Sequence, residues 1–388
     1  MLDPERGHAV PWKEQSTVDQ RAEFCELATR EGANVSALCV AYGISRGVGY
    51  TWLGRWRAEG AAGLVDRSRR PLTSPARTAT AVEDAVLAAR ALHPTWGGRK
   101  LHHWLRAQGV AAPAPSTITA ILDRHARLAP PAARTRPWQR FERTAPNALW
   151  QLDFMGHRPL ADAAGSRVHP LTVLDDHSRF ALGLVACAVE QAAVVQTVLT
   201  SLFRRYGLPD ALLTDNGSPW GACGTGGISA LEAWLIRLGI TVLHGGAYHP
   251  QTQGKIERLH RTIAADVFAS AHLPDLAAAQ AAFDGFRADY NQARPHAAIG
   301  HLVPLARYAP SPRRFPDPLP PVAYAPDDQV RRVQRCGTIS VGNHPYYISK
   351  GVAGQPVALR PTAIDGIVTV RYCHQEIATL DLHRRVRV

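Results

Sequence analysis

The order of strand-like and helix-like segments between residues 149 and 244 constrains the fold more than any other feature of this sequence. The first part reads as strands joined by short connections, with a hairpin turn at residues 175–179: 149–154, 168–174 and 180–187. The second part alternates helices with short buried strands: 190–206, 211–214, 228–238 and 240–243. Strands in succession, followed by strands alternating with helices, predict a mixed α/β sheet covered by helices.

After the last strand, the stretch Tyr248–Arg261 begins with a turn-rich segment, which leads into a helix. Its apolar positions recur at helical spacing and form one stripe: Ile256, Leu259, Ile263 and Val267. Glu257 lies at the edge of this stripe, and Arg258 and Arg261 lie further round the helix. The helix is either a surface helix with a Glu257–Arg261 ion pair, or it presents an acid to a site where a polyanion lies.

Two helical units precede the sheet. In the first, a tight turn separates helix 34–41 from a helix that ends near Glu59, and Ser45 is placed as its N-cap. Helix-turn-helix spacing would direct three side chains of the second helix into a DNA major groove: Arg46, Thr51 and Arg55. A basic tether suited to phosphates follows, with Arg67, Arg69 and Arg70. The alternative is a plain three-helix packing unit.

Composition and turn residues suggest six segments along the chain. We expect a helix-turn-helix DNA-binding domain (1–70), a second helical DNA-binding domain (76–129), a basic linker (130–146), an α/β core (147–308), a Pro-rich linker (309–326) and a small β-barrel (327–388). The basic surplus of the last segment favours nucleic acid as its partner. A dimerisation or spacer module is the alternative.

Charge is distributed unevenly along the chain, whose net charge is +12. Residues 1–145 hold 21 Lys and Arg against 13 Asp and Glu, whereas residues 146–310 hold 12 against 13. Basic flanks around a near-neutral middle favour a polyanionic partner. No apolar run approaches the roughly 18 residues of a membrane span, and the six cysteines are scattered without metal spacing. We therefore expect a cytoplasmic protein with reduced thiols, neither a disulfide framework nor a zinc site.

Three acids stand at strand ends or at a helix start around the predicted sheet: Asp153, Asp215 and Glu257. Each alone has a purely structural explanation: Asp153 as a strand-end charge, Asp215 as a turn residue and Glu257 as a member of a surface ion pair. Phosphodiester chemistry explains all three, because two Mg²⁺ ions roughly 3.5–4 Å apart need carboxylate oxygens around them. Crowded carboxylates would repel each other without such cations. A hairpin turn fully explains Asp175 and Asp176, which we set aside.

Four motifs in the middle region resemble the integrase-core transposases of bacterial insertion sequences: Trp150–Phe154, Leu174–Phe180, Thr214–Ser218 and His249–Arg258. That family belongs to the retroviral-integrase superfamily. The resemblance implies a multidomain chain with an α-helical helix-turn-helix N-terminal region, a ribonuclease-H-like core with a mixed five-stranded sheet, and a small C-terminal β-barrel. The 41 residues between Asp215 and Glu257 exceed the family's usual spacing, and we place the excess in Gly221–Gly227.

The same resemblance implies site residues. Asp153, Asp215 and Glu257 would form the metal-binding catalytic triad. Lys255 and Arg258 would contact the transposon-end DNA, and Arg261 is interpreted as a further DNA-facing cation. The loop Tyr248–Gly254 is expected to be a flap that settles when DNA and metal bind.

The expected protein is a DNA transposase that binds double-stranded DNA, both the terminal inverted repeats and the target. Two Mg²⁺ ions, with Mn²⁺ as a substitute, would assist 3′-end cleavage and strand transfer. Two DNA ends must be held together, so we expect a homodimer or larger assembly on DNA. We also expect the protein to be nucleoid-associated and its DNA binding to weaken as the salt concentration rises. Two alternatives remain open: a decayed, DNA-binding regulator derived from a transposase, and a ribonuclease-H-like nuclease without strand transfer.

Overall fold

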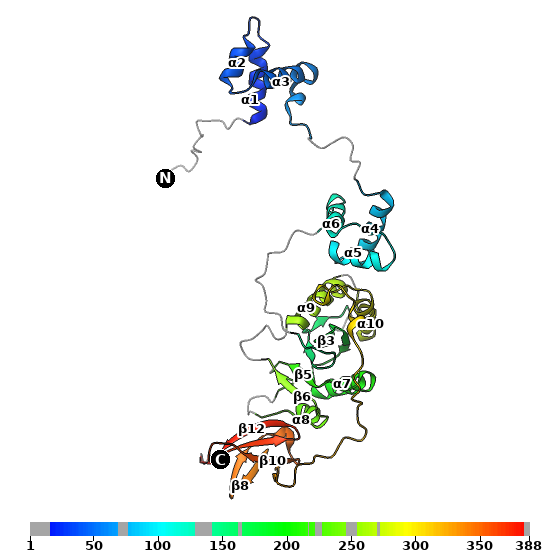
Figure 1. Cartoon of the computed structure of the whole chain (residues 1–388), viewed down its shortest axis with the longest axis vertical. Helices are drawn as coiled ribbons and strands as arrows, with labels where there is room; N and C mark the ends of the chain where they lie inside the picture. The colour runs from blue at the N-terminus through cyan, green and yellow to red at the C-terminus, as the bar shows by residue number, and fades with distance from the viewer. Residues whose placement is uncertain are drawn as a thin grey trace. The chain divides into compact units, whose positions relative to one another are not determined.

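A computed structural model describes residues 16–68, 77–128, 142–161, 165–215, 217–221, 227–245, 254–269 and 272–383 of the 388-residue chain (Figure 1). The chain divides into two compact units, Met1–Arg77 and Thr78–Val388. Within the described ranges, no helix is long and apolar enough to cross a membrane.

The first unit is a three-helix domain of α1 (Thr17–Ala28), α2 (Val35–Ala41) and α3 (Arg46–Glu59). The predicted N-cap is confirmed, since the Ser45 hydroxyl accepts a hydrogen bond from the amide of Val48 at 3.3 Å. Position 49, inside α3, requires a glycine, because a Cβ on Gly49 would overlap the Cys39 sulfur. The close approach of α2 and α3 therefore requires a residue that weakens the helix intrinsically.

The second unit begins with a smaller helical bundle of α4 (Thr80–Leu92), α5 (Gly98–Ala107) and α6 (Pro115–Arg124). Its core consists of apolar side chains that recur at helical spacing, among them Val86, Leu101, Leu105, Ile118, Ile121 and Leu122. All three helices lie within the predicted helical segment 76–129, and a proline begins α6 where its missing N–H costs nothing.

The core sheet is mixed, as predicted. Strand β1 (Trp150–Phe154) pairs antiparallel with β3 (Arg167–Asp175) and parallel with β5 (Ala211–Thr214). Two further strands extend the sheet, β4 (Ala181–Cys187) beyond β3 and β6 (Thr241–His244) beyond β5. A two-residue strand, β2 (Arg158–Pro159), pairs with the start of β3, so the sheet has six strands instead of the predicted five.

Two apolar clusters show which helices cover which face of this sheet. One joins side chains of β1, β3 and β5 to α7 (Ala192–Tyr206) and α8 (Ala230–Arg237). The other joins β3 and β4 to α9 (Gly254–Ile263), to the π-helical turn that follows it (Ala264–Phe268), and to α10 (Leu276–Gln292). The sheet is therefore buried on both faces, and α9 lies on the side opposite α7.

The C-terminal strands form an open sheet and a separate hairpin. The sheet has the order β12-β11-β10-β7, and β8 pairs with β9. Their bounds are β7 Gln329–Arg332, β8 Thr338–Val341, β9 His344–Tyr347, β10 Pro356–Pro361, β11 Ile367–Tyr372 and β12 Gln375–Asp381. The predicted small β-barrel is not confirmed, since the described strands do not close. The physical reason is that their apolar side packs against the core instead of against itself.

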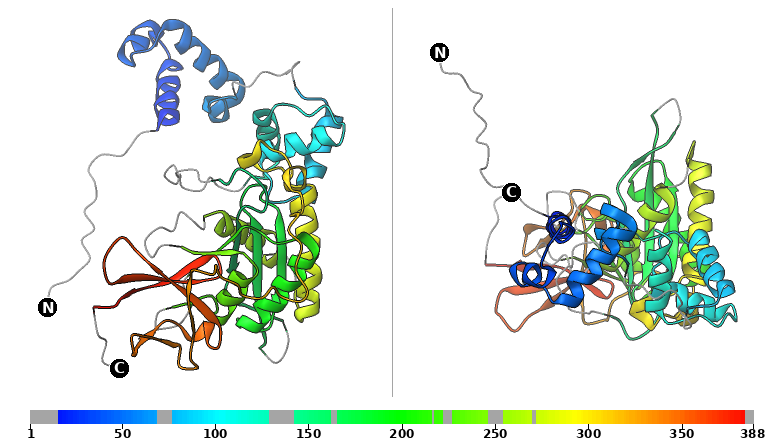
Figure 2. Two further views of the ribbon diagram at one scale, coloured as in Figure 1. Left: turned by 60° about the horizontal axis from the view of Figure 1, so that its bottom comes forward. Right: turned by 90° about the horizontal axis from the view of Figure 1, so that it is seen from above.

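The C-terminal sheet lies beside the core (Figure 2). The two share one apolar cluster, which contains Val357 and Val370 together with Trp150. The Gln375 side-chain amide accepts a hydrogen bond from the Val242 amide at 3.0 Å and donates one to the Val242 carbonyl at 3.2 Å. These bonds cover the exposed edge of β6. Part of the Pro-rich segment predicted as a linker also packs on this cluster, through Phe315, Leu319 and Val322.

Gly351 tests this docking, because a Cβ there would overlap the carbonyl oxygen of Ile228 beside α8. Gly351→Ala is expected to lower the free energy of unfolding by about 1–3 kcal/mol, since a backbone atom cannot move aside cheaply. The measurement is urea denaturation followed by circular dichroism. Gly285→Ala in α10 is the control, with open space around the glycine, and should stabilise by up to about 1 kcal/mol. Equal effects of the two substitutions would contradict the docking.

Candidate active site

The ends of the parallel strands β1 and β5 bring two of the predicted acids together. Gln151 lies opposite Leu213 in this ladder, and the same register continued by two residues sets Asp153 opposite Asp215. The Asp153 side chain is 22% exposed, and Asp215, the first residue after β5, is exposed. The two carboxylates therefore stand at one edge of the sheet, on neighbouring strands.

The third acid, Glu257, lies in the first turn of α9. Leu259 and Ile263 bury the inner side of this helix against the sheet, while Glu257 is exposed. The pKa of Asp153 is raised to about 7, first by burial and then by the negative charge of Asp215, with smaller contributions from Glu190 and Glu257. The charges of Asp215 and Glu257 thus both disfavour ionisation of Asp153. The described residues Glu257 and Arg261 form no ion pair, which disfavours the interpretation as an ordinary surface helix.

A chain of hydrogen bonds joins Asp153 to α9. The Thr172 hydroxyl donates to the Asp153 carbonyl oxygen at 2.8 Å, and His260 Nε2 lies 2.7 Å from the same hydroxyl. Because the hydroxyl proton points to Asp153, His260 is the donor of the second bond. Burial lowers the pKa of His260 to about 4, so its ring is neutral at neutral pH. The sequence analysis missed His260, although its position one turn after Glu257 was a usable signal.

Asp215 is held by its own turn and by a neighbouring histidine. The amide of Gly217 donates to Asp215 Oδ1 at 3.1 Å, as expected of turn chemistry. His244, at the end of β6, lies with Nδ1 3.0 Å from the Asp215 carbonyl oxygen and Nε2 2.6 Å from the buried carboxylate of Glu232. Its pKa is raised, chiefly by the hydrogen bond to Glu232. His244 and Glu232 were also missed, since their contact depends on how α8 packs beside β6.

The cations predicted near Glu257 differ in their surroundings. Lys255 pairs through its amino group with the buried carboxylate of Asp176, and its side chain is only 16% exposed. Arg258 and Arg261 are exposed. The predicted flap, Tyr248–Gly254, lies outside the described residues except for Gly254. Of the predicted glycine-rich insert, only Gly221 and Gly227 are described.

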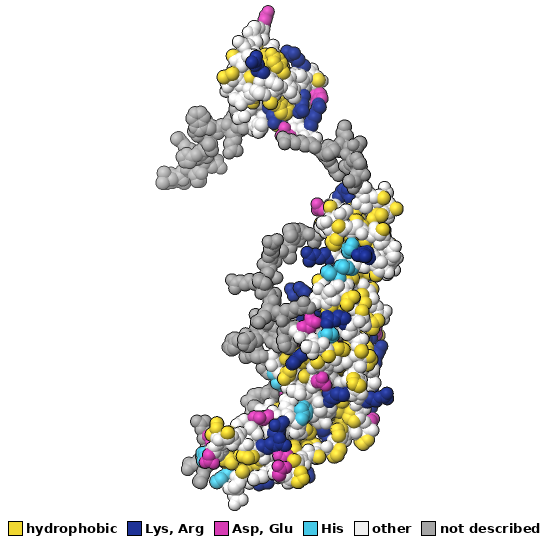
Figure 3. Space-filling view, viewed as in Figure 1, with side chains coloured by type: hydrophobic (Ala, Val, Ile, Leu, Met, Phe, Trp, Pro, Cys, Tyr) yellow, Lys and Arg dark blue, Asp and Glu magenta, His cyan; other side chains and the backbone are white. Residues whose placement is uncertain are grey.

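In the first unit, Arg46 and Thr51 are exposed on α3, and the Thr51 hydroxyl is bonded to the Gly47 carbonyl at 2.8 Å. The Arg55 guanidinium lies 4.8 Å from the centre of the Trp52 ring. Exposed Tyr50 on the same helix was not singled out from the sequence. Figure 3 shows Lys and Arg side chains on the displayed faces of both units. Arg67 pairs with Glu59, whereas Arg69 and Arg70 lie outside the described residues.

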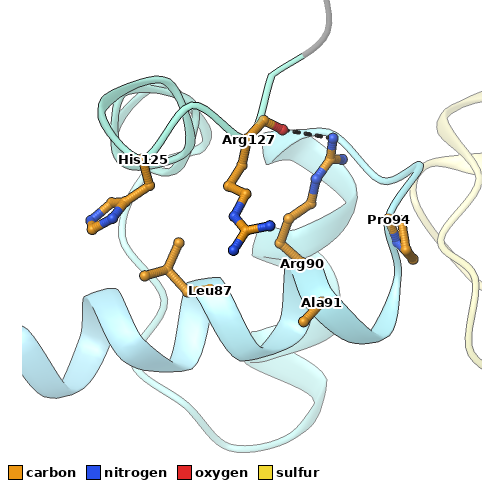
Figure 4. A pocket seen from close by; sticks show the side chains of 6 residues that line it. All are labelled: Leu87, Arg90, Ala91, Pro94, His125 and Arg127. Atoms are coloured by element: carbon orange, nitrogen blue, oxygen red, sulfur yellow. Dashed lines mark hydrogen bonds between the residues drawn. The ribbon is translucent and has the colours of Figure 1, made fainter.

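A hollow of about 530 Å³ lies in the helical bundle of the second unit, away from the three acids (Figure 4). Arg90, His125 and Arg127 contribute cationic or titratable side chains to its lining. The Arg90 guanidinium is already engaged, because it donates to the carbonyl oxygens of Trp96 at 2.5 Å and Arg127 at 2.8 Å. The bond to the Arg127 carbonyl links α4 to the segment that follows α6, so Arg90 has a structural role in this hollow.

The donor set suits a hard divalent cation. Asp153, Asp215 and Glu257 offer carboxylate oxygens, which Mg²⁺ prefers, and their mutual repulsion is what a bound cation would relieve. In the parts of the chain that the structure describes, no three His, Cys, Asp or Glu side chains are already arranged as metal ligands. Two of the acids are exposed side chains with freedom to turn, so their chemistry fits a metal without a preformed cage.

Thr172→Val tests the bond chain that supports Asp153. Thr172 is fully buried, and valine keeps its shape while leaving the Asp153 carbonyl and the His260 nitrogen without their partner. We expect the free energy of unfolding to fall by about 1–3 kcal/mol, measured by urea denaturation. Thr197→Val on α7 is the control, because this residue is exposed and its hydroxyl bonds back to the Ala193 carbonyl of its own helix. An unchanged free energy of unfolding in Thr172→Val would contradict the bridging role of the Thr172 hydroxyl.

Comparison with protein families agrees with the arrangement along the chain. Residues 20–71 match a helix-turn-helix domain and residues 48–122 a homeodomain-like domain. Residues 143–250 and 238–304 match two profiles of the integrase core domain. Residues 328–387 match the C-terminal domain of IS481 family transposases.

Among solved structures, a simian T-cell lymphotropic virus intasome in complex with PP2A regulatory subunit B56 gamma covers 75% of this chain and 97% of its own, at 15% identity and a TM-score of 0.37. The HTLV-2 integrase catalytic core in complex with magnesium covers 42% and 96%, at 15% identity and a TM-score of 0.30.

Two bacterial proteins are similar over most of their length. The 31.7 kDa protein of insertion element IS407 from Burkholderia multivorans is 30% identical over 233 residues, which are 57% of this chain and 80% of that protein. The 39.2 kDa protein of insertion element IS476 from Xanthomonas euvesicatoria is 26% identical over 267 residues, 67% of this chain and 74% of that protein. With an integrase core between helix-turn-helix domains and a transposase C-terminal domain, the chain belongs to the insertion-sequence transposases with a retroviral-integrase-type, ribonuclease-H-like core.

Proposed function

We propose that this transposase binds the ends of its insertion sequence and catalyses Mg²⁺-dependent 3′-end cleavage and strand transfer into target DNA. The observation that carries the proposal is the juxtaposition of Asp153 and Asp215 at the ends of neighbouring parallel strands. The charges of Asp215 and Glu257 both act on the Asp153 carboxyl. Two acids whose charges disfavour ionisation of a third do not stabilise a fold, whereas cation-assisted phosphodiester chemistry needs such a group.

Asp153, Asp215 and Glu257 would hold two Mg²⁺ ions, with Mn²⁺ as a substitute. When bound, the ions lower the pKa of an attacking water or 3′-hydroxyl and stabilise the leaving oxygen. The protein's own side chains orient the ligands: Thr172 and His260 hold the backbone at Asp153, and Gly217 and His244 hold the turn at Asp215. No side-chain nucleophile is required, so no covalent protein–DNA intermediate is expected.

DNA contacts are assigned by exposure and charge. Arg258 and Arg261 extend from the same helix as Glu257 and are exposed, so they suit the phosphates of the transposon end. In the helix-turn-helix domain (1–70), Arg46, Thr51 and Arg55 would approach bases, and Arg67, Arg69 and Arg70 the backbone. The second helical domain (76–129) would lengthen the site that is read. Binding of two ends requires a homodimer or a larger assembly.

A strand-transfer assay with labelled terminal DNA and Mg²⁺ tests the function directly. Asp215→Asn is expected to reduce joining by more than about 100-fold, because loss even of an outer partner of a metal ligand costs roughly 10–100-fold. Asp210→Asn is the matched control, since this nearby acid is 71% exposed and pairs only with Arg313. Equal activity of Asp215→Asn and wild type would refute catalysis and favour a DNA-binding regulator. Nicking without joining would favour a ribonuclease-H-like nuclease.

Metal binding can be measured without DNA. A ligand that binds only the folded state stabilises it by about 2.7 kcal/mol when its concentration is 100 times its Kd. Mg²⁺ should therefore raise the thermal midpoint of wild type, EDTA should reverse the rise, and Asp153→Asn should abolish it. NaCl at the same ionic strength serves as the control. An equal Mg²⁺-dependent rise in the Asp153→Asn/Asp215→Asn double variant would place the metal elsewhere.

A further inference from the structure

We propose that Asp176 is a positioning residue whose buried carboxylate, through Lys255, holds the first turn of α9 so that Glu257 faces Asp153. The inference rests on the proposed function, to which it adds a residue outside the three acids. Asp176 lies in the turn between β3 and β4, where a hairpin turn alone seemed sufficient to explain it. Its contacts go well beyond those of a turn residue.

The two acids of this turn have different hydrogen-bond partners and therefore different roles. Asp175 makes the turn, since its carboxylate accepts hydrogen bonds from the Ser178 amide at 2.8 Å and the Ser178 hydroxyl at 2.6 Å. Asp176 is fully buried, and its carboxylate contacts residues of three other segments. Oδ1 accepts from Gln151 Nε2 at 2.9 Å and pairs with the Lys255 amino group, and Oδ2 accepts from the Arg143 amide at 2.8 Å.

Two of these partners stand at equivalent distances along the chain from the candidate metal ligands. Gln151 is two residues before Asp153 in β1, and Lys255 is two residues before Glu257 in α9. Asp176 therefore connects the strand that carries one acid to the helix that carries another. A shift of α9 along or away from the sheet would break the pair with Lys255 before it moved the buried stripe of the helix far.

The position of Lys255 also argues that the Asp176–Lys255 pair holds the first turn of α9, a role that we call the clamp. A cation in the first turn of a helix lies at the positive end of the helix dipole, where it is unfavourable. Helix stability therefore does not explain it. A lysine kept for DNA would extend into solvent, whereas this side chain is only 16% exposed and is paired with a carboxylate that has no access to water. A buried carboxylate needs a paired cation, and Lys255 supplies it.

The test compares Asp176→Asn, Lys255→Met, Lys255→Arg and the Asp176→Asn/Lys255→Met double variant with wild type. Asp317→Asn is the control, an acid that is 77% exposed and paired at the surface with Arg204. The first readout is hydrogen exchange of the metal-free, DNA-free protein. The clamp predicts faster exchange of the amides of residues 254–259 in Asp176→Asn and Lys255→Met, with α10 unchanged. Lys255→Arg, which keeps a cation, should recover most of the protection.

The second readout separates positioning from DNA binding. At saturating DNA ends, we expect the strand-transfer rate of Asp176→Asn and Lys255→Met to fall about 10–100-fold, as for outer partners of metal ligands. DNA affinity and its salt dependence should not change. The double variant should be no slower than the slower single variant, because the two substitutions remove the same interaction, the Asp176–Lys255 pair.

Contrary results are equally definite. If Lys255→Met weakens DNA binding and lowers the salt slope by about one, while exchange in α9 is unchanged, Lys255 is a phosphate contact and the clamp is refuted. If Asp176→Asn fails to fold, Lys255→Met and Lys255→Arg still give both readouts. If wild type shows no strand transfer, the proposed function fails, whereas the exchange experiment still decides whether Asp176 and Lys255 hold α9.

Discussion

The core depends on two carboxylates that are buried in the turn between β3 and β4. A buried charge destabilises the fold unless hydrogen bonds and a cation compensate it. Both acids accept hydrogen bonds, and Asp176 also pairs with a cation. The partners from distant segments belong to the entry segment, to β1 and to α9: Asn147, Arg143, Gln151 and Lys255. Satisfying these two charges therefore fixes where the chain enters the sheet and where α9 begins. The turn lies opposite the start of β1, and Gln151 and Lys255 connect it to the strand and the helix that carry two of the candidate metal ligands.

A second constraint is the edge of the sheet at β6. An exposed edge strand invites pairing with other chains, and here the C-terminal sheet covers it through Gln375 and a shared apolar cluster. The consequence reaches the candidate site, because β6 carries His244, which contacts the turn at Asp215. In this chain the C-terminal segment supports the core as well as carrying a surplus of basic residues.

Local pattern was sufficient for much of the fold. The helices of both helical units, the order of the core strands and the C-terminal strands follow from periodicity, caps and turn residues such as Ser45. The positions of Asp153 and Asp215 at strand ends were also predictable, and their catalytic roles stay a prediction. The barrel was not confirmed, because strand patterns alone do not say whether a sheet closes or packs on another domain. Asp176 was set aside, because its partners are distant in sequence.

The sequence by itself determined the element order, the family motifs and the identity of three acids suited to metal, because these depend on residue type and spacing along the chain. Only the tertiary structure decided how the acids are supported. Thr172, His260, His244 and the Asp176–Lys255 pair act through contacts between segments 12 to 88 residues apart, and no periodicity records such contacts. Burial added what no motif could show: the lysine beside Glu257 is expected to contact DNA by motif, whereas the structure pairs it with the buried carboxylate of Asp176.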